Sequence, residues 1–89
     1  MPEFLIKERF KNTFLMDQFV VNENTAFALN YKNITELLKK AKNRDGLAQI
    51  LASTELYNGN QIISMAKQFG VSVGAMAIRL DELDLLTWK

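Results

Sequence analysis

A glycine and a serine two residues apart place a tight turn between two apolar stretches near the C-terminus. Gly70 suits the left-handed position just past a helix end, and Ser72 can cap the helix that follows. Val71 precedes this cap and Met76 lies four residues after it, which is the spacing of a hydrophobic staple. Leu80 continues the apolar stripe, so this part of the chain is predicted to form a helix-turn-helix-like pair.

The N-terminal third is less uniform. Four-residue steps from Ile6 to Phe14 predict a helix over about residues 2–15. In residues 19–31 two short apolar runs flank an asparagine-rich turn, which favours a small β-hairpin. A short helix over Asn24–Leu29 fits that segment nearly as well, so both alternatives stay open.

Polar residues in the middle of the chain mark the starts of three further helices. Asn33 can cap the first, and Glu36 three residues later completes the pattern of a capping box. Asp45 can cap the second, whose apolar stripe begins at Leu47. Asn60 can cap the third, which leads into the glycine turn. The sequence Tyr-Asn-Gly-Asn at residues 57–60, which follows the second of these helices, is typical of a turn.

These segments define the expected fold class. With 89 residues, the chain fits a single domain over residues 1–89. Its 48% hydrophobic and 24% charged residues are typical of a globular protein. We expect a mainly α domain of four to five short helices with a C-terminal helix-turn-helix-like pair and room for one small β-hairpin.

The amino-acid composition limits the kinds of functional site that this chain can form. The chain has no cysteine, which excludes disulfides and thiolate metal sites, and no histidine, which removes the commonest metal ligand and general base. We therefore expect no catalytic residue, no metal and no cofactor. The net charge is +1, and no apolar run approaches the length of a membrane span or the core of a signal peptide. A cytoplasmic protein without membrane contact is expected.

One C-terminal segment resembles a known family. The stretch MAKQFGVSVGAMAIRLDELDLL, residues 65–86, is similar to the C-terminal signature of ImmA/IrrE-type metallopeptidases. The matching positions are Ala66, Phe69, Val71, Ser72, Ala75, Arg79, Leu80, Leu83 and Leu85. The first two residues also resemble the Leu-Met-Pro that follows the zinc-binding helices in this family.

The resemblance implies a regulatory role without catalysis. Family members bind zinc through a His-Glu-x-x-His helix, and this chain has no histidine, so neither zinc ligands nor peptidase activity carry over. The resemblance implies the C-terminal part of such a protein, either a fragment or a free-standing relative. It would support a missing catalytic domain or dock a protein partner such as a helix-turn-helix repressor. The family is tied to mobile elements and stress responses, and the isolated chain is expected to show exposed apolar surface or to self-associate.

The alternative function is a small DNA-binding transcriptional regulator that uses the same helix pair. A recognition helix inserts its N-terminal residues into the major groove. The exposed residues there would be Ser72, Val73, Gly74 and Ala77, and none makes the bidentate base contacts that dominate readout. From residue 71 to 89 there are two basic and three acidic residues, a net charge of −1. The charge therefore disfavours DNA.

Arg79 and the acids after it are interpreted as structural. Arg79 lies beside the apolar stripe, where a guanidinium more often pairs with a carboxylate such as Glu82 or Glu36 than with a ligand. Asp81 and Asp84, together with Glu82, are read as surface charge, since helical geometry spreads Asp81 and Glu82 about 100° apart.

The basic run is the candidate contact surface. Lys39, Lys40, Lys42 and Arg44 crowd the end of one predicted helix, where cations also favour the helix dipole. That stabilising role is the more ordinary one, and contact with an acidic protein face or with nucleic acid is the functional one. If these residues fold beside the second helix of the C-terminal pair, DNA binding gains support. If the acids surround that helix, DNA binding loses it.

Overall fold

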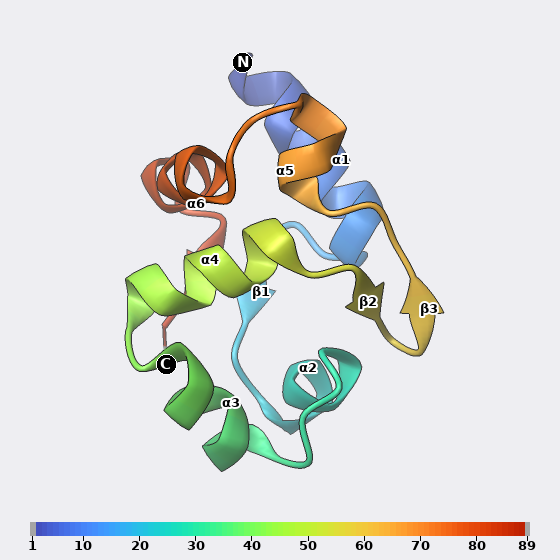
Figure 1. Cartoon of the computed structure of the whole chain (residues 1–89), viewed down its shortest axis with the longest axis vertical. Coiled ribbons are helices and arrows are strands. Elements are labelled where there is room, and N and C mark those ends of the chain that lie inside the picture. Colours follow the sequence, from blue (N-terminus) through green and yellow to red (C-terminus); the bar gives the residue numbers. More distant parts are fainter. Residues whose placement is uncertain (1, 89) are drawn as a thin grey trace.

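The computed structural model describes residues 2–88 and is mainly helical, as the sequence predicts (Figure 1). The elements in chain order are α1 Glu3–Phe14, β1 Phe19–Val20, α2 Glu23–Ala28, α3 Ile34–Ala41, α4 Arg44–Ser53, β2 Leu56–Tyr57, β3 Asn60–Gln61, α5 Met65–Phe69, α6 Val73–Glu82 and β4 Leu86–Thr87. None of the helices within this range is long and apolar enough to cross a membrane.

The hairpin that the pattern favoured in residues 19–31 is wrong, and the alternative helix is right. Asn22 accepts a hydrogen bond from the Thr25 backbone N–H at 2.8 Å, and the Thr25 hydroxyl accepts one from the Asn22 N–H at 2.9 Å. This reciprocal cap starts α2 at Glu23. The preceding apolar pair forms β1, which pairs in parallel with β4 and sets Phe19 beside Leu86.

The corner between α3 and α4 differs from the predicted one. Asn33 caps α3 as expected, accepting from the Glu36 N–H at 2.9 Å. However, Asn43 caps α4, accepting from the Gly46 N–H at 2.8 Å, so the Asp45 cap is wrong. The reason is the turn at Lys42, whose φ of 72° ends α3 early. A Cβ on Gly46 would lie 1.7 Å from the Ala41 carbonyl oxygen, so only glycine fits this close approach.

The small β-hairpin lies further along the chain than expected. β2 and β3 pair antiparallel around Asn58 and Gly59, whose φ angles of 56° and 81° are both positive. This Asn-Gly pair is the preferred sequence for a two-residue hairpin turn. Asn60 therefore lies in a strand, and the predicted cap there is wrong. Ser64 caps α5 instead, accepting from the Lys67 N–H at 3.2 Å.

The C-terminal pair follows its prediction closely. Gly70 ends α5 with φ 64°, and Ser72 caps α6 by accepting from the Ala75 N–H at 3.1 Å. Met76 and Leu80 are fully buried, and Val71 packs against the core in a half-buried position, as a staple requires.

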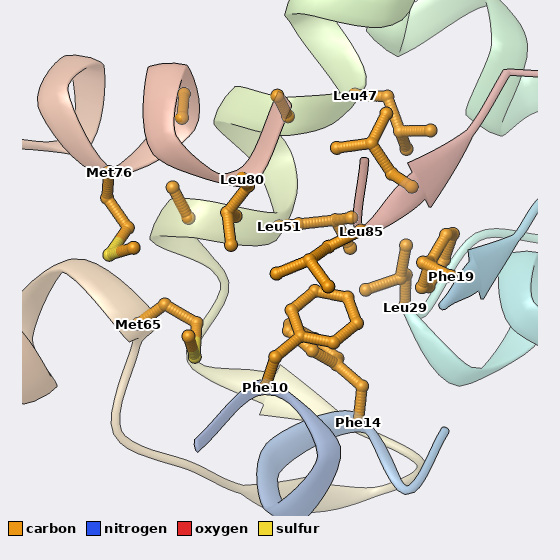
Figure 2. Close-up of a cluster of buried hydrophobic side chains, with 14 of the residues drawn as sticks. Phe10, Phe14, Phe19, Leu29, Leu47, Leu51, Met65, Met76, Leu80 and Leu85 are labelled. Carbon is orange, nitrogen blue, oxygen red and sulfur yellow. The ribbon is translucent and has the colours of Figure 1, made fainter. Parts of the chain in front are cut away.

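One hydrophobic core joins the two ends of the chain (Figure 2). Phe10 and Phe14 of α1 lie in it with ring centroids 4.9 Å apart, and Tyr57 meets Phe14 edge-on at 5.1 Å. Burial raises the pKa of the Tyr57 hydroxyl. Leu85 and Leu86 are buried in the same core, so the C-terminal segment packs back onto the domain. The core fixes α4 in the middle of the fold, with α6 and α3 on its two flanks.

Candidate functional site

The outer ridge of α4 separates two grooves. Asp45, Gln49 and Ser53 are spaced four residues apart and all are exposed, so they form one row along the helix. Asp45 and Gln49 line both grooves. α4 packs chiefly against α6 on one flank and against α3 on the other (Figure 1). Asp45 lines both grooves, but the other charged lining residues are acidic in one groove and basic in the other.

The acidic groove lies between α4 and α6 and has a volume of about 300 Å³. Its lining residues are Asp45, Ala48, Gln49, Gly74, Ala77, Ile78, Asp81 and Glu82. Small residues form much of the lining, and Ile78 is 60% exposed. Three carboxylates and no cation line this groove.

Arg44 ties the two helices of the acidic groove together. The structure places it in the first turn of α4, not in the last turn of α3 where the sequence had put it. Its Nε donates to Asp81, and its Nη2 donates to Asp84 at 2.9 Å. The hydrogen bond to Asp81 raises the pKa of the guanidinium further above its ordinary value. Arg44 is therefore engaged inside the domain, and it differs in this from the lysines that precede it.

The acids at the end of α6 and just after it are more than dispersed surface charge. Asp81 and Asp84 converge on Arg44, an arrangement that sequence spacing alone did not indicate. Glu82 points elsewhere and pairs with Arg79 at 3.1 Å. The expectation that Arg79 pairs with a nearby carboxylate is thus confirmed, with Glu82 as the partner. All three acids have an ion-pair partner within the domain.

The basic groove lies on the α3 flank of α4 and has a volume of about 510 Å³. Its lining residues are Lys40, Ala41, Lys42, Asn43, Asp45, Gly46, Gln49, Ile50, Ser53 and Val73. Lys40 and Lys42 are exposed, and no ion pair among residues 2–88 involves either of them. Two open cations thus stand beside a surface that includes Ile50 and Val73.

Lys39 belongs to a different surface. It lines a hollow on the side of α3 together with Asn33, Thr35 and Glu36. The four predicted contact residues are therefore divided three ways. Lys40 and Lys42 share the basic groove, Lys39 lies outside it, and Arg44 is held by acids.

The helix in the recognition position meets both signs of charge. Val73, its first residue, lines the basic groove at 39% exposure. Gly74 and Ala77 line the acidic groove instead. The expectation that Ala77 is exposed is wrong, since it is 6% exposed and packs in the core. Sequence analysis made DNA binding depend on the charges around this helix. Those charges are basic beside Val73, which favours DNA, and acidic along the rest of the outer face, which disfavours it.

No grouping of three or more His, Cys, Asp or Glu side chains within residues 2–88 is arranged to hold a metal ion. Comparisons with family models, with curated proteins and with solved structures give no match. The resemblance to ImmA/IrrE-type proteins accordingly rests on residues 65–86 of the sequence.

Sequence reasoning missed Ile50, Gly46 and Asn43 as parts of the site. The sequence did contain a signal for the last two. An asparagine can cap a helix that starts just after it, and a glycine three residues later allows the first turn to approach another segment closely. Ile50 carried no such signal, since an apolar residue on a central helix is expected in the core.

Proposed function

We propose that this chain is a non-catalytic protein-docking domain related to the C-terminal region of ImmA/IrrE-type regulatory proteins. In this role it supports a catalytic domain or binds a protein partner such as a helix-turn-helix repressor in the cytoplasm. The observation that carries the proposal is the acidic groove, since Gly74, Ala77 and Ile78 open onto three carboxylates at the position of a recognition helix. Such a lining offers no cation to a phosphate backbone, whereas a protein surface can match it.

The exposed apolar side chains support protein contact. Phe4, Leu15 and Phe27 are each about three-quarters exposed, and Ile63 is 64% exposed. Large aromatic side chains in contact with water are typical of surfaces that another protein covers. The net charge of +1 supplies little repulsion between copies, which favours association of any kind.

A titration with a labelled DNA duplex at two salt concentrations tests the choice between docking and DNA binding. We expect no binding at low salt. Affinity that falls steeply with added salt would contradict the proposal, because that slope counts released phosphate counterions.

The chain alone provides the complementary test. We expect binding of a hydrophobic dye to the folded chain, or self-association in sedimentation, because the exposed aromatic residues have no cover within the domain. A monomer that binds no dye would contradict a domain built to rest against another protein.

A further inference from the structure

We propose that the basic groove binds an acidic, amphipathic segment of a partner protein, with Lys40 and Lys42 holding its carboxylates and Ile50 and Val73 contacting its apolar residues. This inference rests on the proposed docking function and names both the surface and the chemistry of its partner. The groove follows one side of α4, since Asp45, Gln49 and Ser53 of that helix line it. A ten-residue helix is about 15 Å long, which matches four to five residues of an extended segment or almost three turns of a helix.

The charge argument depends on which ions are already paired. On the α6 flank the carboxylates of Asp81 and Asp84 are both ion-paired with Arg44 within the domain. On the α3 flank Lys40 and Lys42 have no carboxylate within ion-pair distance among the residues of the described range. Their charge is available to a ligand without breaking any internal contact, so complementarity calls for an anionic partner.

The lining of the groove argues for a peptide rather than a simple anion. Ile50 is half-buried and Val73 is 39% exposed, so each has apolar surface left to cover. Covering that surface stabilises a complex by about 25 cal/mol per Å² of apolar area removed from water. A segment with acidic and apolar residues uses both features, whereas a free anion uses only the lysines.

The surroundings argue against nucleic acid. Asp45 lines the basic groove itself, and the carboxylates of the acidic groove begin on the other side of the same ridge. A duplex carries one charge per roughly 1.7 Å and extends past a short groove. Its phosphates would meet Asp45 and Glu82. A short acidic peptide can end before the ridge and avoid Glu82, so that Asp45 is the one carboxylate of the groove lining that it meets.

The test uses a dye-labelled peptide in which pairs of glutamates alternate with single leucines, and a second peptide with lysines in place of the glutamates. We expect fluorescence anisotropy to show binding of the first peptide only, with affinity that falls as salt rises. The variant carrying K40E and K42E should bind the acidic peptide about tenfold more weakly or worse. A thermal melt of this variant close to that of the wild type shows that the fold is retained.

The matched control carries K32E and K39E. Both lysines are exposed and precede the groove closely in the chain, but neither lines it. We expect this variant to keep its affinity within about twofold, because the net charge change is the same and only the location differs. Equal weakening by both variants would overturn the proposal in favour of diffuse attraction. Absence of any binding by the wild type would overturn it as well.

Two further measurements, DNA binding and sedimentation, distinguish the acidic segment from other molecules that could occupy the basic groove. If a DNA duplex binds and K40E with K42E removes that binding, the groove belongs to nucleic acid, and both this inference and the docking function fail. If the same variant turns a dimer into a monomer in sedimentation, the occupant is a second copy of the chain, and this inference alone fails. If the acidic peptide and the duplex both fail to bind while the chain binds hydrophobic dye, the docking function stands and only the acidic partner is excluded.

Discussion

The two flanks of α4 both carry charged residues but use them in opposite ways. On the α6 flank Arg44 of α4 pairs with Asp81 and Asp84, which ties α4 to the end of α6. Arg79 pairs with Glu82 within α6 itself. On the α3 flank Lys40 and Lys42 remain open beside a groove. A run of basic residues in a sequence therefore does not define one surface, because its members can fall on either side of a helix start.

The basic run is divided between the two flanks at the segment from Lys42 to Arg44. The left-handed φ at Lys42 ends α3, and Asn43 caps α4, so the chain passes from one helix to the next within two residues. Arg44 then lies in the first turn of α4 beside the end of α6. If α3 had continued, all four basic side chains would have lain on consecutive turns of one helix.

The largest expected effect tests whether α6 presents one buried and one open face. Leu80→Ala should lower the free energy of unfolding by about 2–5 kcal/mol, since Leu80 is fully buried in the core. Ile78→Ala, on the outer face, should change it by less than about 0.5 kcal/mol. Urea unfolding of both variants checks this. A comparable loss from Ile78→Ala would mean that the acidic groove is closed in solution.

The next effect tests the tight corner on the basic flank. Gly46→Ala should destabilise the domain by about 1–3 kcal/mol, because its Cβ would strike the Ala41 carbonyl oxygen and the helices must separate. Gly74→Ala is the matched control in α6. Nothing lies within 4 Å of its Cβ position, so this change should be neutral or stabilise by up to about 1 kcal/mol. Equal destabilisation by the two changes would contradict the close packing of α3 on α4.

A smaller effect tests the backbone strain at the division itself. Lys42→Gly should stabilise the domain by about 1 kcal/mol, since a left-handed φ of 72° disfavours residues with a Cβ. Lys40→Gly removes the same charge from a regular helix and should destabilise by a similar amount. Thermal melts of the pair should therefore shift in opposite directions. Shifts of the same sign would show that α3 does not end at Lys42.

How much of this the sequence predicted depends on the range of the interactions involved. Gly70, Ser72 and the stripe of Met76 and Leu80 followed from local capping and periodicity, and the structure confirms each of them. The helix pattern of α1 is confirmed for the same reason. Local rules were sufficient for these elements, but they misplaced two caps of the same short range, since Asn43 caps α4 and Ser64 caps α5 where Asp45 and Asn60 were predicted.

Long-range contacts decided the rest. The pairing of Phe19 with Leu86 joins strands at opposite ends of the chain, and no local pattern announces it. Arg44 and Asp81 are likewise 37 residues apart. The hairpin at Asn58 and Gly59 was different, because its turn dipeptide was visible in the sequence while its strands, two residues each, were too short to show alternation.

A double-mutant cycle between Arg44 and Asp81 tests the central contrast most directly. Urea unfolding of Arg44→Ala, Asp81→Ala and the double variant yields the coupling free energy between the two side chains. We predict a coupling of about 0.5–1 kcal/mol, the upper range for partly exposed ion pairs. The parallel cycle of Lys40→Ala with Asp81→Ala should give a value near zero. A vanishing Arg44–Asp81 coupling, or an equal one for Lys40, would contradict the account of one paired and one open flank.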